Sequence, residues 1–442
     1  MIKLRKKTIS GKLLPLYILL FVCTTKWLFE GVLDAPFFED IFLFIAMVIA
    51  MIQNRGRIRY TALIWILFIA NIIFSVLLHD PTVGRLGRAG LMSLMMMLIL
   101  FIDYEPGTYS ELYIYTVKLA VFYAIFLILQ FILGTSFNNV YFPLLTPSYR
   151  YVANYYYGRK YIFGLIFNPH EIAVLITIAI IVLVLRQMIC SEKKTSRVIM
   201  AVLLLVPLLM TQKKGVIFVS LFVFFLVICV LYASRKQAIK ILGAAILITV
   251  VLFLVVRYAL VQGSNSVVLY RIAKFITRLA AGEISDSGRI KLYSIAVREF
   301  SRNKLFGIGW RKFNSTILSS YGYHSGHEVN MDYLQWLCET GIVGFLMNII
   351  PVVVMLGRTI ILCFRYVRRL PDSDKKWVVL TAVYTQFFTV IYACFEIPFY
   401  DNLCFGFYVL SCIIINGSYY AMKREKSSVR VERTTGRDAL KT

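Results

Sequence analysis

The side chains best suited to chemistry lie in residues 286–344, the one long polar segment of an otherwise apolar chain. His324 and His327 are two of only four histidines, and Glu328 follows the second directly. An imidazole beside a carboxylate can act as a general base, because the carboxylate orients the ring and stabilises its protonated form. If residues 323–339 are helical, one polar stripe would contain His324, Glu328, Asp332, Gln335 and Glu339.

Two other interpretations of these histidines remain open. The first is a solvated helix entrance in which the histidines are incidental. The second is a zinc site, but no convincing third ligand accompanies the pair. The eight cysteines lie mostly inside or at the ends of apolar runs, and none forms a CxxC pair. We therefore predict no metal and no cofactor.

Basic side chains are the second ingredient of the predicted site. A guanidinium matches phosphate oxygens bidentately, and a basic pocket at the membrane surface suits a lipid diphosphate headgroup. Arg289 starts a predicted helix, residues 289–300, while Lys213 and Lys214 stand at the outer end of an apolar run. Contact with anionic lipid headgroups is the competing interpretation for cations in such positions. The predicted diphosphate-binding residues are Arg289, Arg150, Arg159, Lys160 and Lys214.

The composition requires a membrane to hold these residues in place. Of 442 residues, 59% are hydrophobic and 16% charged, whereas soluble domains carry about 25% charged residues. Twelve apolar runs are long enough to span a bilayer. Their centres lie near residues 20, 46, 69, 94, 123, 178, 204, 224, 249, 350, 387 and 411. Because helices satisfy their own backbone groups in lipid, we expect an all-α, polytopic bundle of about 12 transmembrane helices.

Charge predicts the topology of this bundle. Lysine and arginine concentrate in alternate connections and in both termini, which places those connections, the N-terminus and the C-terminus in the cytoplasm. Residues 103–111 form the one predicted cytoplasmic loop without a basic residue. The net charge of +25 is therefore explained by topology, and nucleic acid is not an expected partner.

We expect residues 1–442 to form a single membrane domain with two long outside segments. Residues 134–168 are rich in tyrosine, as in an interfacial aromatic belt, and contain three basic residues but no acid. Residues 261–335 form the larger predicted extracytoplasmic loop, which we expect to be the catalytic region. Within this loop, residues 268–279 have the periodicity of an amphipathic helix on the membrane surface. Residues 422–442 form a basic cytoplasmic tail.

Missing motifs exclude several other functions. There is no P-loop for ATP-driven transport and no DxD-like site for a nucleotide sugar. Charged residues are nearly absent from the centres of the apolar runs, which disfavours an ion-coupled transporter. A transporter or flippase that uses the large loop as a lid remains the alternative from another class.

Several motifs resemble the O-antigen ligase and O-antigen/capsule polymerase superfamily. The similarity runs through SGRIKLYSIAVREF, NKLFGIGWRKF and DYLQWLCETGIVG, about 60 residues in all. GLIFNPHEIA, residues 164–173, is similar to a family span entrance, with His170 in place of asparagine. In LMTQKKG, Lys214 stands at the family's usual arginine. Asn330 and Met331 stand at the family's His-Asn, one helical turn after His327.

The resemblance implies a membrane-embedded glycosyltransferase whose donor is a polyprenyl-diphosphate-linked glycan. The acceptor is another lipid-linked repeat unit in polymerases, or a lipid core sugar in ligases. We favour a polymerase for capsule, exopolysaccharide or O-antigen in the bacterial cytoplasmic membrane, working beside a flippase and a chain-length regulator. Basic residues would stabilise the departing diphosphate, and His327 or Glu328 would deprotonate the attacking hydroxyl.

Overall fold

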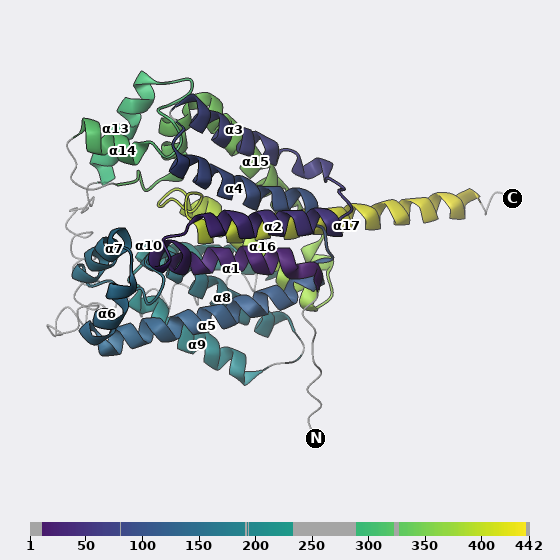
Figure 1. The fold of residues 1–442 in the computed structure, drawn as a ribbon. Helices are drawn as coiled ribbons and strands as arrows, with labels where there is room; N and C mark the ends of the chain where they lie inside the picture. Colours follow the sequence, from purple (N-terminus) through teal and green to yellow (C-terminus); the bar gives the residue numbers. More distant parts are fainter. Residues whose placement is uncertain are drawn as a thin grey trace, which may run out of the picture.

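A computed structural model describes residues 11–79, 81–190, 192, 194–232, 289–321 and 327–438, and these ranges contain helices and no strand. Figure 1 shows the long helices packed side by side as one bundle. The helices are α1 (Leu14–Lys26), α2 (Phe37–Gln53), α3 (Trp65–Leu78), α4 (Val83–Phe101), α5 (Ser110–Leu133), α6 (Thr135–Tyr141), α7 (Pro147–Gly158), α8 (Pro169–Ile189), α9 (Thr195–Met210), α10 (Lys214–Tyr232), α13 (Arg289–Arg302), α14 (Phe313–Ser320), α15 (Asp332–Arg365), α16 (Asp374–Tyr392) and α17 (Asn402–Asp438).

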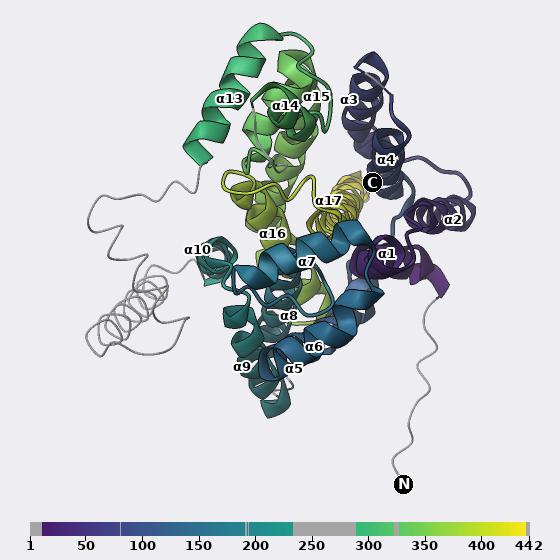
Figure 2. The ribbon, with the colours of Figure 1, turned by 60° about the vertical axis from the view of Figure 1, so that its left-hand side comes forward.

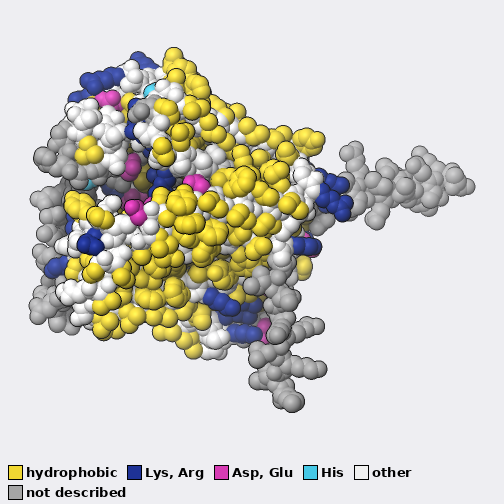
Figure 3. All heavy atoms as spheres, viewed as in Figure 1, with side chains coloured by type: hydrophobic (Ala, Val, Ile, Leu, Met, Phe, Trp, Pro, Cys, Tyr) yellow, Lys and Arg dark blue, Asp and Glu magenta, His cyan; other side chains and the backbone are white. Residues whose placement is uncertain are grey.

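The predicted all-α class is confirmed for the described residues, whereas the predicted count of about 12 transmembrane helices is not. Within the described ranges, six helical segments are long and apolar enough to cross a membrane: Gly11–Val32, Val83–Phe101, Pro106–Leu133, Pro169–Ile189, Asp332–Arg369 and Asn402–Arg424. Shorter apolar helices are Trp65–Leu78, Thr195–Met210 and Lys214–Cys229. Of the twelve predicted centres, the one near residue 249 lies outside the described residues, and the others fall within described helices. Figure 3 shows apolar side chains covering most of the middle of the bundle on the face in view.

The centre of the bundle consists of α8, α16 and the first half of α17, whose side chains are mostly buried. The apolar character of α8 is nearly uniform around the helix, as expected for a span enclosed by other helices. Figures 1 and 2 show α6, α7, α13 and α14 together at one end, whereas α1 begins and α17 extends at the opposite end.

The acidic connection at residues 103–111 is neutralised by a neighbouring connection. Asp103 forms an ion pair with Arg59, and the Arg59 guanidinium lies 4.7 Å from the centroid of the Tyr420 ring in α17. Residues 103–111, which contain no basic residue, are therefore paired with a positive charge from the connection that contains Arg59.

The predicted helix at residues 289–300 is confirmed by α13, but the predicted continuous helix at residues 323–339 is wrong. The chain at residues 327–331 is not helical, and Asn330 has a φ of 57°. Helix α15 begins only at Asp332. Glu328 therefore precedes the helix instead of sharing a stripe with Gln335 and Glu339 on it, and His327 also precedes it. The amphipathic helix predicted at residues 268–279 lies outside the described residues.

Two glycine-containing turns explain why the motifs NKLFGIGW and ETGIVG occur together. Gly307 and Gly341 both have positive φ, 68° and 64°, and α15 is interrupted at Gly341. The backbone nitrogens of Ile308 and Gly309 donate to the carbonyls of Cys338 and Glu339, at 3.1 and 2.8 Å. Each turn thus satisfies backbone groups exposed by the other, which only close approach of the two backbones permits.

Gly307→Ala and Gly341→Ala should each destabilise the protein by more than about 1 kcal/mol. A Cβ at Gly307 would overlap the backbone of Glu339, and one at Gly341 would overlap Leu305 and Phe306. Heating in detergent followed by size-exclusion chromatography would measure the loss as a lower apparent Tm. Gly357→Ala is the matched control, because a Cβ there meets open space on the same helix. An unchanged Tm in both turn variants would contradict this account.

Candidate functional site

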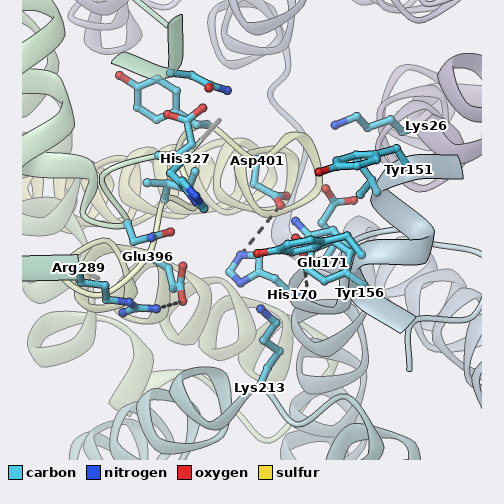
Figure 4. Close-up of a pocket in the computed structure, with 18 residues that line it drawn as sticks. Lys26, Tyr151, Tyr156, His170, Glu171, Lys213, Arg289, His327, Glu396 and Asp401 are labelled. Atoms are coloured by element: carbon cyan, nitrogen blue, oxygen red, sulfur yellow. Dashed lines mark hydrogen bonds and ion pairs between the residues drawn. The ribbon is translucent and has the colours of Figure 1, made fainter. Parts of the chain in front are cut away.

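A polar cavity of about 670 Å³ opens at the end of the bundle that carries α7 and α13. Its size is typical of small-molecule sites. Figure 4 shows side chains from distant parts of the chain converging on it. The residues around it are Lys26, Tyr151, Val152, Tyr155, Tyr156, Asn168, His170, Glu171, Lys213, Arg289, Asn314, His327, Glu328, Asn330, Glu396, Ile397, Tyr400 and Asp401.

Arg289 lies at one side of the cavity, as the first residue of α13. Its Nη2 donates to Glu396 Oε1 at 2.8 Å and its Nη1 to the Phe395 carbonyl at 3.0 Å. Burial disfavours the charged guanidinium, but the Glu396 carboxylate outweighs this and holds the pKa of Arg289 above its ordinary value. The side chain remains 36% exposed, so a held and fully charged guanidinium faces the cavity.

Lys213 adds a second cation to the same region. It precedes α10 and lines the cavity below His170 in Figure 4. Burial lowers the pKa of its ammonium, against the opposing effect of Glu396. The sequence had favoured Lys214 for this role, but Lys214 is absent from the described lining residues.

His327 and Glu328 lie in the connection that leads into α15, and both line the cavity. Gln335 fixes this connection, because its Nε2 donates to Glu328 Oε2 at 2.6 Å and its Oε1 accepts from the Val329 nitrogen at 3.2 Å. Burial raises the pKa of Glu328, and Arg311 and the Gln335 hydrogen bond partly offset that rise. The carboxylate is thereby a stronger base than in water.

Glu339 of the ETG motif supports the site from beneath. Its Oε2 accepts from the Arg311 nitrogen at 2.8 Å and from the Tyr400 hydroxyl at 2.7 Å. Its Oε1 accepts from the Phe313 nitrogen and from Gln335 Nε2, both at 3.2 Å. Four donors from three segments therefore meet at one buried carboxylate, which positions Gln335 and Tyr400.

His170 occupies the floor of the cavity near the start of α8. The Asn168 side chain caps this helix by accepting from the His170 nitrogen at 3.0 Å. The imidazole Nδ1 lies 2.7 Å from the Tyr392 hydroxyl. Its Nε2 lies 3.4 Å from Cys404 Sγ and 4.0 Å from Asp401 Oδ2. Buried partners therefore surround both ring nitrogens.

His170, Asp401 and Cys404 could together offer three ligand atoms to a metal ion, since these atoms lie within 4.8 Å of one another. Nitrogen, oxygen and sulfur ligands of these types suit zinc. Each group also has a role within the fold: Asp401 Oδ1 accepts from the Cys404 nitrogen at 3.0 Å at the start of α17, and Tyr392 holds the imidazole. The absence of a metal from the site therefore remains a prediction of the sequence.

The other predicted diphosphate residues do not line this cavity in the described part of the chain. Arg150 donates to the carbonyls of Phe142, Pro143 and Leu145 at 3.0, 2.9 and 3.1 Å, and so braces the entry to α7. The Arg159 guanidinium lies 4.2 Å from the Tyr155 ring centroid. Lys160 is exposed, and its carbonyl accepts from Gln212 at 3.1 Å. His324, the other predicted base, lies outside the described residues.

Sequence reasoning missed several residues that the fold places in the cavity. Glu396 and Asp401 lie in the connection between α16 and α17, and no motif in the sequence marked them as site residues. Lys26 and Glu171 sit at helix ends like ordinary flanking charges. The tyrosine-rich composition of residues 134–168 could have pointed to the cavity, because Tyr151, Tyr155 and Tyr156 of α7 line it.

Comparison with known proteins agrees with the motifs found in the sequence. No curated protein matches the chain. The family model described as O-antigen ligase matches residues 199–349, which contain Arg289, His327, Glu328 and both glycine turns. The chain is similar to this family over those residues, and the match agrees with the resemblance found in the sequence motifs.

Proposed function

We propose that this protein is a glycosyltransferase that polymerises polyprenyl-diphosphate-linked oligosaccharide repeats into a surface polysaccharide. The observation that carries the proposal is the placement of Arg289 and Lys213 in the same cavity as His327 and Glu328. Two cations that can bind a diphosphate therefore lie within one site with two groups that can accept a proton.

The reaction needs only groups present in the cavity. The oxygen of an acceptor hydroxyl bonds to the anomeric carbon of the donor sugar, and the bond from that carbon to the diphosphate oxygen breaks. The diphosphate leaves with the bonding electron pair, and its charge is stabilised by Arg289 and Lys213. The hydroxyl proton passes to His327 or Glu328.

A ligase would use the same donor and the same proton transfer with a lipid core sugar as acceptor. The alternative of a transporter or flippase needs no proton acceptor beside the diphosphate. The pairing of Glu328 with Gln335 at 2.6 Å, next to His327, is better explained by chemistry than by passage of a glycan.

The site should face away from the cytosol. The cavity lies at the end of the bundle opposite to the start of α1 and the extension of α17, which carry the basic termini. By the positive-inside rule those termini are cytoplasmic. A flippase would then deliver the lipid-linked repeat to the outer leaflet, and a chain-length regulator would act there.

Purified protein incubated with the lipid-linked repeat provides the direct test. The substrate is extracted from membranes of a strain that lacks this gene and accumulates single repeats. A gel ladder of lengthening glycan supports the polymerase. Transfer only to an added lipid core sugar identifies a ligase. Absence of transfer to either acceptor would contradict the proposal that the protein is an enzyme.

We expect a chelator to leave the rate of this reaction unchanged. Arg289 and Lys213 supply the positive charge at the diphosphate, so no metal ion is required. The assay compares EDTA-treated and untreated protein, with metal content measured by mass spectrometry. Loss of activity with EDTA, restored by zinc but not in Cys404→Ser, would instead assign a metal to His170, Asp401 and Cys404.

A further inference from the structure

A second, smaller chamber of about 160 Å³ lies beside the main cavity, between α1, α7 and the start of α8. Five residues line both spaces: Lys26, Val152, Tyr156, Asn168 and Glu171. Its volume is close to the roughly 150 Å³ cavity that holds one benzene ring. The chamber can therefore take a single six-membered ring that enters from the main cavity.

Aromatic side chains form the walls of this chamber. Trp27, Tyr149 and Phe167 line it and do not line the main cavity. The Trp27 ring is held by its Nε1 donating to the Tyr123 hydroxyl at 3.1 Å. The Tyr149 hydroxyl donates to Glu30, and the Tyr149 and Phe167 ring centroids lie 4.8 Å apart. The walls are thus fixed in advance, which lowers the entropy cost of binding a flat apolar face.

The polar residues at the opening suit hydroxyl groups. Glu171 is buried and shares a side-chain hydrogen bond with Asp401, and Asn168 brings a side-chain amide to the same opening. Within the described ranges, the Lys26 ammonium has no hydrogen-bond or ion-pair partner, although it lines both spaces. Burying a purely apolar group against the Lys26 ammonium would leave that charge unsatisfied. A pyranose ring has apolar faces and a polar edge, and so matches both surfaces.

We propose that this chamber is the binding subsite for the terminal sugar of the acceptor; the inference rests on the proposed function. In a displacement at the anomeric carbon, the acceptor hydroxyl approaches from the side opposite the departing diphosphate. Arg289 and Lys213 lie on one side of the main cavity, and Lys26 and Tyr151 lie across it (Figure 4). None of the cations expected at the diphosphate lines the small chamber. The donor sugar stays beside its diphosphate, so the ring in the chamber belongs to the acceptor.

The test uses Val152→Trp, which places a large side chain at the opening shared by both spaces. The donor is the lipid-linked repeat from a strain lacking this gene, and the acceptor is the same oligosaccharide released from its lipid by mild acid. The variant should raise the KM for the released acceptor about tenfold or more and leave the KM for the donor unchanged. Asn154→Trp is the matched control, because Asn154 is exposed on the same helix and lines neither space.

Three outcomes separate this inference from the proposed function. An unchanged acceptor KM, or an equal rise in donor KM, overturns the acceptor subsite while glycan transfer by the wild type stands. If the wild type transfers no glycan, the proposed function fails; calorimetry with the released oligosaccharide then still tests the chamber, and equal binding by wild type and variant refutes it. If Val152→Trp does not fold, Tyr156→Ala removes a wall residue and must show the same KM split.

Discussion

Arg289→Ala should lower the rate of glycan transfer by about 10²- to 10³-fold without preventing membrane insertion. The guanidinium is held by Glu396 at 2.8 Å and faces the cavity, where the leaving diphosphate gains negative charge. Arg289→Lys should recover only part of the rate, because an ammonium cannot bind two phosphate oxygens through a planar fork. Polymer length in cells and laddering with purified protein both measure the effect.

The matched control for this prediction is Lys291→Ala. Lys291 is an exposed cation two residues further along α13 and does not line the cavity. The control should keep normal polymer. Full activity in Arg289→Lys would mean that charge alone matters, and full activity in Arg289→Ala would remove this residue from the diphosphate site.

Loss of the proton acceptor should have an effect of similar size, about 10²- to 10⁴-fold. His327→Ala and Glu328→Gln each remove one candidate while leaving the helix that follows intact. Burial raises the pKa of Glu328, so its carboxylate is a stronger base than an exposed glutamate carboxylate. The Gln335 side chain orients it. The variant with the larger loss in kcat, at unchanged KM for the donor, identifies the base.

Asn330→Ala is a useful comparison for these two variants. Asn330 lines the same cavity in the same connection but has no group that accepts a proton at neutral pH. Its side chain should matter less than either candidate base. Normal polymer in both His327→Ala and Glu328→Gln would contradict the assignment of this connection as the source of the base.

The predicted site and the observed cavity agree for residues that could be selected from their local sequence alone. Arg289, His327 and Glu328 were selected because unusual polar residues stood within an apolar chain, and all three line the cavity. The predicted helix through residues 323–339 failed for a tertiary reason. The Asp332 nitrogen donates to the carbonyls of Ala393 and Glu396 in the connection between α16 and α17. The Gln335 side chain binds Glu328 and the Val329 nitrogen, so residues 327–331 are held outside the helix. Such contacts cannot be predicted from the periodicity of the sequence.

Arg150 and Lys213 also show the difference between what the sequence predicts and what the tertiary structure decides. Both are cations near outer helix ends, and the sequence favoured Arg150 as a phosphate ligand. The fold turns Arg150 onto three backbone carbonyls at the entry to α7, whereas Lys213 lines the cavity. Which cation meets a ligand depends on the direction of the side chain, and that direction is set by neighbours distant in sequence.

By itself, the sequence determined the helical membrane class, the segment proposed to carry the chemistry and the superfamily it resembles. These properties follow from hydropathy, charge and short motifs, each of which is local along the chain. Only the tertiary structure decided that His170, Glu396 and Asp401 join the site, and that α7 encloses a second chamber beside it. A cavity forms between helices, and its lining comes from helix ends that lie together only after the bundle has packed.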